Sequence, residues 1–341
     1  MRDPILTPDN LQLSEANTGQ TEAGITERFA INCTHDLFPS TSPIQLTEAA
    51  SDLLAHAIAP NTERAYHSDL RHFRDWGGVL PATPATICAH IGDQAGRLAV
   101  ATILRRIATL SGVHSASGLS NPCETEIVKA ALRGLKRKHG TAQKQARPLL
   151  RDELLLVLDR MGDSLRDRRD RTLLLLGFAG GFRRSELVAL ERGDLEITRQ
   201  GLIATIRRSK TDQDGAGRRI GIPRGRTRHC PVVAVEAWLT VSGIYAGPLF
   251  RPITRHGHVV PEALTGDAVS ALLRERLDAA GIDPKGYSGH SLRAGFATSA
   301  VQAGVSTLQI RAQTGHSSDA VLARYVRQGE LFTGNAAGAL L

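Results

Sequence analysis

The chain has 341 residues, and at about 150 residues per domain this length predicts two domains with ample material for hydrophobic cores. Charged residues make up 22% and apolar residues 41%, which is typical of a globular protein and excludes a disordered or fibrous one. The net charge of +8 is compatible with a polyanionic ligand such as nucleic acid, although a solvated Lys and Arg surface would give the same total.

The sequence has no pattern typical of membrane insertion or export. Its longest nearly apolar run, Thr172 to Phe182, is too short to span a bilayer. The first residues lack the basic and then apolar segments of a signal peptide, so we expect a cytoplasmic protein without membrane contact. Four scattered cysteines with no CxxC pair argue against a zinc cluster and against a disulfide framework.

The first part of the chain is predicted to be helical after a flexible leader. Residues 1–45 are rich in Thr, Ser, Asn and Pro and show no sustained apolar periodicity, which predicts the leader. Apolar residues then recur every three or four positions, without an intervening strand pattern, so residues 46–140 are predicted to form an all-helical bundle. The expected helices cover about 47–58, 60–76, 84–95, 97–112 and 123–138.

A basic stretch closes this part of the chain. Residues 129–151 contain eight Lys and Arg residues and no acidic residue. On a helix, Lys129, Arg133 and either Lys136 or Arg137 would share one face, as a helix lying against a phosphate backbone requires. The alternative is a solvated helix end that leads into the predicted linker, residues 141–148. The apolar residues that could pack on the other face are Ile127, Ala131, Leu132 and Leu135.

From residue 149 onward the pattern is mixed. The glycine pair at 180–181 interrupts a helical pattern, and alternating segments at 201–209 and 218–222, with a turn at Asp214-Gly215, predict a hairpin. Residues 149–327 are therefore predicted to form a mainly helical domain with a small antiparallel sheet. The expected helices cover about 151–161, 168–179, 185–192, 231–241, 265–281, 290–303, 306–313 and 318–326.

Several short patterns in this second domain are weak when each is taken alone. Arg183 stands where a glycine-rich turn enters a helix, with Glu186 one turn later, which is also typical of a structural ion pair. Lys210 lies at the edge of the hairpin tip, where surface lysines are common. His290 and Arg293 are three positions apart near a helix start, so their side chains point to the same side.

The last pattern pairs a histidine with a downstream tyrosine. His316 follows Gly315, and Tyr325 comes nine positions after His316 beside apolar residues, a setting more typical of a core tyrosine. The combination and order of all these residues, however, resemble the tyrosine recombinases of the phage integrase family over about residues 50–330. The resemblance is strongest to Cre-type recombinases in residues 238–243, 287–293 and 303–306 and in the length of chain beyond the tyrosine.

The resemblance implies a C-shaped clamp on DNA, and the chemistry of the residues explains why they belong together. Arg183 and Arg293 would neutralise the charge that grows on the phosphate when Tyr325 attacks it. His290 would accept the tyrosine proton, and Lys210 would protonate the departing 5′ oxygen. His316 would donate a hydrogen bond to the phosphate, where Cre has a tryptophan, and Glu186 would support the arginines.

By the same resemblance, the reaction passes through a 3′-phosphotyrosyl linkage, in integration, excision or resolution. Because one phosphoester replaces another, neither ATP nor a metal ion is needed. The expected partners are duplex DNA with an inverted-repeat target site and three further copies of the chain, in a homotetramer on two sites. Residues 328–341 would dock on a neighbouring protomer; the alternative is a frayed tail.

Three other functions compete with this interpretation. A catalytically silent DNA-binding accessory protein could share the fold, but binding alone would not require this set of polar residues. A metal-dependent phosphodiesterase would need clustered carboxylates, which the sequence does not offer. A type IB topoisomerase shares the chemistry, but a monomeric enzyme would not need the Cre-like tail.

Overall fold

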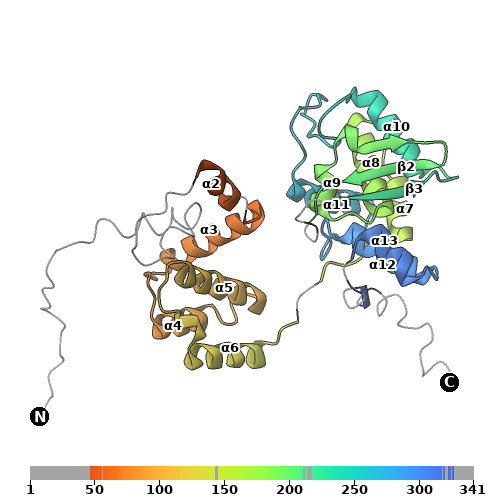
Figure 1. Ribbon diagram of the computed structural model, residues 1–341. Helices are drawn as coiled ribbons and strands as arrows, with labels where there is room; N and C mark the ends of the chain where they lie inside the picture. Colours follow the sequence, from red (N-terminus) through yellow and green to blue (C-terminus); the bar gives the residue numbers. More distant parts are fainter. Residues whose placement is uncertain are drawn as a thin grey trace, which may run out of the picture. The chain divides into compact units, whose positions relative to one another are not determined.

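The computed structural model describes residues 47–55, 57–142, 145–209, 212, 217–316, 318, 322–323 and 325. The chain divides between residues 143 and 144 into two compact units, which run from red to yellow and from green to blue in Figure 1. The predicted leader and the predicted tail lie outside the described residues. No helix in the described ranges is both long and apolar enough to cross a membrane.

The first unit is helical in the described ranges, and local sequence signals set its helix ends. Pro60 and Pro84 occupy first helical turns, where a missing N–H leaves no hydrogen bond unmade. The Thr83 hydroxyl caps α4 by accepting from the Thr86 amide at 3.2 Å, and Gly140 ends α6 with a φ of 72°. The helices are α2 (Glu48–Ala55), α3 (Pro60–Asp75), α4 (Pro84–Gln94), α5 (Val100–Ala116) and α6 (Glu126–His139).

Two helices of this unit start later than the periodicity predicts. The helix expected at 97–112 begins at Val100, because residues 95–98 form a turn with a bridge between Ala95 and Leu98. The helix expected at 123–138 begins at Glu126, after the short 3₁₀ turn Pro122–Glu124. These starts show that turn chemistry, rather than apolar spacing, fixes where a helix begins.

The core of the first unit is built from α3, α4, α5 and α6. Phe73, Ile87, Ile103 and Val128 are fully buried in it. The expected inner face of α6 is wrong at one position, because Ile127 is 59% exposed and the adjacent Val128 takes the buried place. Leu135 is buried as expected, and Ala131 and Leu132 pack against the core.

The second unit is mainly helical with one small sheet, as the sequence predicts. Helix α8 contacts both α10 and α12, so it lies within the helical layer of the unit. The expected helix at 185–192 ends at Ala189 and is followed by a 3₁₀ turn, Arg192–Asp194. The helices are α7 (Arg151–Asp159), α8 (Leu165–Ala179), α9 (Arg184–Ala189), α10 (Pro231–Ser242), α11 (Gly266–Ala279), α12 (Ser291–Gln302) and α13 (Thr307–Thr314).

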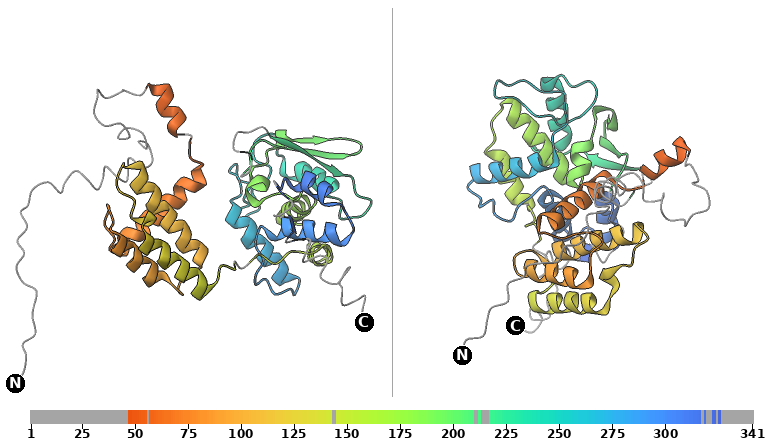
Figure 2. Two further views of the ribbon diagram at one scale, coloured as in Figure 1. Left: turned by 60° about the horizontal axis from the view of Figure 1, so that its bottom comes forward. Right: turned by 90° about the vertical axis from the view of Figure 1, so that its left-hand side faces the viewer.

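The sheet has three antiparallel strands in the order β1 (Leu195–Ile197), β2 (Gly201–Ile206) and β3 (Arg218–Pro223). The strands β2 and β3 form the expected hairpin, whereas β1 was not predicted because three residues are too few to show alternation. Ala204 lies opposite Ile220, and both side chains are buried. The left view of Figure 2 shows the sheet along one side of the helices.

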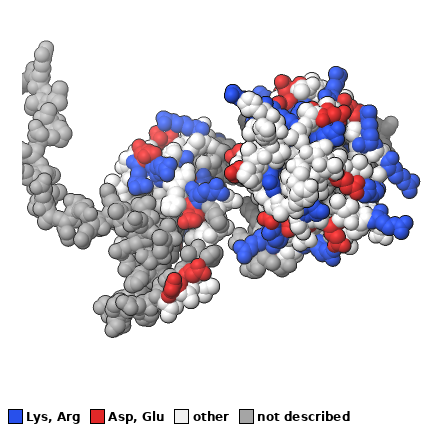
Figure 3. All heavy atoms as spheres, turned by 90° about the horizontal axis from the view of Figure 1, so that it is seen from above, with Lys and Arg blue, Asp and Glu red and all other residues white. Residues whose placement is uncertain are grey.

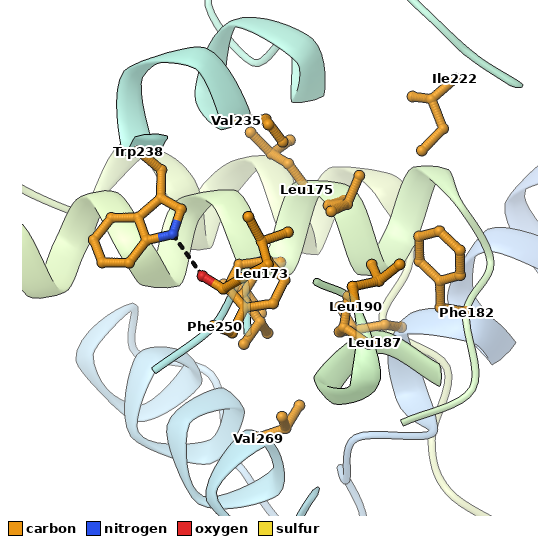
Figure 4. Packing of buried hydrophobic residues seen from close by; sticks show 14 of the residues in the cluster. Leu173, Leu175, Phe182, Leu187, Leu190, Ile222, Val235, Trp238, Phe250 and Val269 are labelled. Carbon is orange, nitrogen blue, oxygen red and sulfur yellow. Dashed lines mark hydrogen bonds between the residues drawn. The ribbon is translucent and has the colours of Figure 1, made fainter. Parts of the chain in front are cut away.

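The core of the second unit is one cluster of buried residues from the helices and the sheet, and Figure 4 shows part of it. Phe182, Leu187 and Val235 pack there with no more than 1% exposure. Trp238 is fully buried, and its indole N–H donates to the Leu249 carbonyl at 2.9 Å, so its polar group is satisfied. This core supports the turns from which the candidate site residues project.

The end of the predicted linker already belongs to the second unit. The Arg147 backbone N–H donates to the Gly286 carbonyl at 2.9 Å, and its guanidinium lies 4.9 Å from the Tyr287 ring centroid. Leu149 is fully buried, and its N–H donates to the Ser291 carbonyl at 3.0 Å. The chain therefore enters the second unit beside the first turn of α12.

Surface charge does not single out a functional face in the view of Figure 3. Lys and Arg side chains are interspersed there with Asp and Glu side chains over the larger body. Many are paired across elements, for example Arg219 with Glu196 at 2.7 Å and Arg166 with Glu275 at 2.8 Å. In this view, the surface charge alone therefore does not show where an anionic ligand would bind.

Candidate active site

The first candidate group lies at the start of α9. Gly181 follows α8 with a φ of 57°, a left-handed conformation that favours glycine, and the buried Phe182 then fixes the turn. Arg183 is the N-cap residue of α9. Glu186 accepts from the Arg183 amide at 2.9 Å and from the Arg183 Nη1 at 2.6 Å. The Glu186 side chain is only 1% exposed, so its negative charge is stabilised by these hydrogen bonds from Arg183.

Arg293 lies in the first turn of α12 and is almost completely buried, at 1% exposure. Its Nη1 donates to the carbonyl of Gly181 at 2.8 Å and to the carbonyl of Thr314. Its Nη2 is also buried but has no hydrogen-bond partner among the described residues. Backbone carbonyls thus fix one side of the guanidinium and leave a donor unused, as an anion-binding group requires.

His316 is placed by the end of α13. Gly315 ends this helix in the left-handed conformation, with a φ of 66°, and Arg183 Nη2 donates to its carbonyl at 3.1 Å. The His316 side chain is buried, at 8% exposure, and its Nδ1 lies 2.7 Å from the Thr314 hydroxyl. The turn after α13 therefore brings His316 to the same place as Arg183.

Tyr325 completes the cluster. Leu322, Ala323 and Tyr325 are helical, and the other residues of the expected helix at 318–326 are outside the described residues or not helical. The Tyr325 hydroxyl lies 3.0 Å from His290 Nε2, and the Tyr325 ring centroid lies 5.7 Å from that of His316. His290 caps the N-terminus of α12 and is exposed. A phenol is thus in hydrogen-bond contact with an imidazole beside two arginines.

Burial and positive charge determine the protonation of the histidines. Burial, followed by the guanidiniums of Arg293 and Arg183, lowers the pKa of His316 to about 3. Although His290 is exposed as a whole residue, partial burial of its imidazole, followed by the guanidiniums of Arg293 and Arg183, lowers its pKa below the ordinary value of 6.5. Both imidazoles are therefore neutral near pH 7, and His290 can accept a proton.

The arginines keep their charge under the same conditions. Burial, followed by the charge of Arg183, lowers the pKa of Arg293 to about 10, which still leaves the guanidinium protonated near neutral pH. With one buried carboxylate against several guanidiniums, the cluster is positively charged. It is suited to bind an anionic group next to the Tyr325 hydroxyl.

The structure does not describe Lys210, and the predicted DNA-binding residues belong to the first unit. Lys210 lies outside the described residues; next to it, the Ser209 N–H donates to the Asp212 carbonyl at 3.2 Å, between strands β2 and β3. The four predicted DNA-binding residues Lys129, Arg133, Lys136 and Arg137 lie on α6, in the first unit, and are exposed. Arg133 also forms an exposed ion pair with Glu126 at 3.4 Å.

The sequence analysis missed one residue of the cluster, Arg218. Its Nη2 donates to Glu186 Oε2 at 3.0 Å. Arg218 lies on the same face of β3 as Ile220 and Ile222, which are buried, so the alternation along the strand places an arginine on the inward face. That alternation was the available signal.

The described residues contain no group of three or more His, Cys, Asp or Glu side chains that could hold a metal ion. The cluster consists of arginines, histidines, one glutamate and one tyrosine. Its chemistry is that of anion binding with a nucleophile and a proton acceptor.

Comparisons with known proteins agree with this geometry. The phage integrase family matches residues 147–330, which is more than half of the chain. An integrase/recombinase xerD homolog of Selenomonas ruminantium is 40% identical over 302 residues, covering 86% of this chain and 89% of that protein. The recombinase cre of Escherichia phage P1 is 30% identical over 281 residues, covering 76% of this chain and 80% of that protein.

A solved structure shows the same fold. The crystal structure of the XerH site-specific recombinase bound to palindromic difH substrate, a post-cleavage complex, matches with a TM-score of 0.61 and 18% identity. The match covers 90% of this chain and 87% of that chain. The order of the site residues, their convergence and these relatives lead to one conclusion: the chain belongs to the phage integrase family and is a site-specific tyrosine recombinase.

Proposed function

We propose that Tyr325 is the nucleophile with which this recombinase cuts duplex DNA. Its oxygen attacks the scissile phosphorus, the bond from phosphorus to the 5′ oxygen breaks, and a 3′-phosphotyrosyl linkage forms. The observation that carries this proposal is the 3.0 Å contact between the Tyr325 hydroxyl and His290 Nε2 beside Arg293 and Arg183. Trapping of a covalent adduct on a nicked DNA substrate tests it.

The proposal assigns the two proton transfers to different residues. His290 accepts the proton of the Tyr325 hydroxyl, since its lowered pKa keeps the ring neutral and its Nε2 already faces that hydroxyl. Lys210 donates a proton to the departing 5′ oxygen. That role follows from the family resemblance and from the position of Lys210 between β2 and β3.

The arginines bind the phosphate and stabilise its transition state. Arg293 has an unused donor at Nη2, and Arg183 is held next to it by Glu186 and the Gly315 carbonyl. His316 donates a further hydrogen bond from Nε2. This requires the proton on Nε2, so the Thr314 hydroxyl must donate to Nδ1 instead of to the Ile310 carbonyl, which also lies 2.7 Å from it.

The two units are assigned different tasks on DNA. Residues 46–140 form a core-binding domain, residues 141–148 a linker and residues 149–327 the catalytic domain, and together they close as a C-shaped clamp around a duplex. The exposed basic face of α6, defined by Lys129, Arg133, Lys136 and Arg137, neutralises phosphates and positions the protein without reading sequence.

This assignment of α6 predicts the salt dependence of binding. Replacing Lys129, Lys136 or Arg137 with Ala should weaken binding to any DNA sequence and reduce the slope of log K against log salt by up to about one unit. Arg133→Ala should change it less, because Glu126 already neutralises part of that charge. Fluorescence anisotropy titrations at several salt concentrations measure the slope. An unchanged slope in all four variants would support the alternative of a solvated helix face.

We further propose that the working unit is a homotetramer on two DNA sites. Strand exchange requires four phosphodiester cuts, and each chain offers one Tyr325. The target is an inverted repeat, on which two protomers bind with two-fold symmetry. Residues 328–341, which lie outside the described residues, couple the protomers by docking on a neighbour. Because its substrate is DNA, we place the protein in the cytoplasm.

If the tail couples protomers, its deletion should affect recombination but not the binding of one protomer to DNA. Deletion of residues 330–341 should leave the affinity for a single half-site within about twofold, while cooperative occupancy of a full site and recombination are lost together. Burial of Leu340 and Leu341 would contribute about 1.5–3 kcal/mol per side chain to that contact. Mobility-shift assays on half and full sites, with recombination assays in parallel, measure both. A truncated protein that still recombines would show that the tail has no such role.

A further inference from the structure

Arg218 connects three parts of the candidate active site. It is the first residue of β3, and its side chain is 21% exposed. Its Nη2 donates to Glu186 Oε2 at 3.0 Å, and its Nη1 donates to the carbonyl of Gln313 at 3.0 Å. The contacts join the hairpin to α9, whose N-cap is Arg183, and to the last turn of α13.

Glu186 is shared between two guanidiniums. Its Oε1 accepts from Arg183 Nη1, and its Oε2 accepts from the Arg183 backbone N–H and from Arg218 Nη2. A carboxylate that is 1% exposed is stable as an anion only when such partners surround it. The orientation of the carboxylate, and therefore of Arg183, depends on the contact from Arg218.

The turn after α13 is shaped around this guanidinium. A Cβ atom at Gly315 would lie 2.5 Å from Arg218 Nη1, closer than any normal contact. The φ of 66° at Gly315 also favours glycine over other residues. The Gly315 backbone therefore passes close to the Arg218 guanidinium, which is held by its hydrogen bonds to Glu186 and Gln313.

The hydrogen bonds of Arg218 are directed at the protein. Nη1 donates to the Gln313 carbonyl and Nη2 to Glu186, while the buried Nε has no partner among the described residues. Burial, partly offset by Glu186, also lowers the pKa of Arg218. Because both Nη atoms are bound by protein acceptors, the outer end of the guanidinium orients its neighbours Glu186 and Gln313.

We propose that Arg218 is a positioning residue of the recombinase, which holds Glu186 so that the Arg183 guanidinium is aimed at the scissile phosphate. This inference rests on the proposed role of Arg183 in phosphate binding. Removal of Arg218 lets Glu186 and Arg183 turn together, and a small displacement of an aligned group is enough to slow a reaction strongly. DNA affinity should depend little on it, because both Nη atoms of Arg218 are bound by Glu186 and Gln313.

The test compares single-turnover cleavage of a nicked substrate at saturating DNA. Arg218→Ala should cleave about 10- to 100-fold more slowly, with half-site affinity within about threefold of the wild type. Arg218→Lys should recover part of the rate, because a lysine keeps one charge against Glu186 but cannot reach both acceptors. The matched control is Arg219→Ala. Arg219 is the next residue of β3, is exposed on the other face, pairs with Glu196 and should leave the rate unchanged.

A double-mutant cycle distinguishes positioning from a merely structural role. If Arg218 acts through Arg183, the double variant R183A/R218A should cleave within about threefold of R183A alone. If the rate defect of the double variant equals the product of the two single defects, the inference is wrong. It is also wrong if a folded Arg218→Ala variant cleaves at the wild-type rate. If Arg218→Ala does not fold, Glu186→Gln breaks the same link at constant volume and should show the same non-additivity with R183A; multiplied defects there would overturn it too.

The same experiments separate this inference from the proposed function. A wild-type rate for R183A would mean that Arg183 does not stabilise the transition state, and the proposed function and this inference would both be wrong. A slow R183A together with a normal Arg218→Ala would overturn only the role of Arg218.

Discussion

Tyr325→Phe is expected to abolish covalent attachment to DNA while specific binding stays within about twofold. Phenylalanine keeps the ring, which lies beside His316, and removes only the oxygen that contacts His290 Nε2. Removal of a nucleophile costs at least about 10³-fold in rate, so no adduct should be detectable. A nicked substrate that traps the intermediate, analysed on a denaturing gel with a parallel mobility-shift assay, measures both quantities.

The chain offers a matched control for this experiment. Tyr245 is 91% exposed and lies outside the site, so Tyr245→Phe should give the wild-type amount of adduct. The assay should be run in excess EDTA without nucleotide, where the wild type is expected to form the adduct fully. DNA cleavage without a covalent adduct that is lost under chelation would favour a metal-dependent phosphodiesterase. Binding without any wild-type adduct would favour the catalytically silent accessory protein.

The sequence predicted the fold class and most elements because these depend on local patterns. The α8 pattern stops at a glycine pair, and the structure ends the helix there, at Ala179. The spacing of His290 and Arg293 placed both near the start of one helix, and the structure has His290 at the N-cap and Arg293 in the first turn of α12. Such features need only the periodicity of a helix and the conformational freedom of glycine.

The features that were missed depend on contacts between distant segments. Strand β1 is only three residues long and exists because it pairs with β2, with Leu195 opposite Ala204. Arg218 stands beside Arg219 in the sequence, and its partners Glu186 and Gln313 are 32 and 95 positions away. A sequence read without its fold shows neither pairing.

The site residues were found through their order along the chain, and their geometry adds what that order lacks. Order alone placed Arg183, Arg293 and Tyr325 in one set. The structure shows that Arg293 has carbonyl partners on Nη1 and an unused donor on Nη2. It also shows that the Tyr325 hydroxyl contacts His290. These two observations support separate roles for the residues of the motif: Arg293 as a phosphate-binding group and His290 as the proton acceptor for Tyr325.

The second large effect is expected at Arg293. Arg293→Ala should lower single-turnover cleavage by about 10²–10³-fold, the usual cost of removing one donor that stabilises a transition-state charge. Arg293→Lys keeps the positive charge but lacks the planar guanidinium, which can donate to the Gly181 and Thr314 carbonyls and to a phosphate at the same time. The lysine variant should therefore recover little of the cleavage rate. Rapid-quench cleavage at saturating DNA measures the rates, and thermal unfolding measures the fraction folded.

A buried arginine outside the site separates catalysis from stability. Arg169 is 6% exposed and pairs with Asp170 at 2.6 Å, so Arg169→Ala also removes a buried guanidinium and should lower the melting temperature. Its cleavage rate per folded molecule should nevertheless match the wild type.

A methylphosphonate at the scissile position removes the charge that Arg293 neutralises, and on this substrate the Arg293→Ala defect should shrink about tenfold or more. An equal defect on both substrates would mean that Arg293 only supports the carbonyls of Gly181 and Thr314, and that another group binds the phosphate.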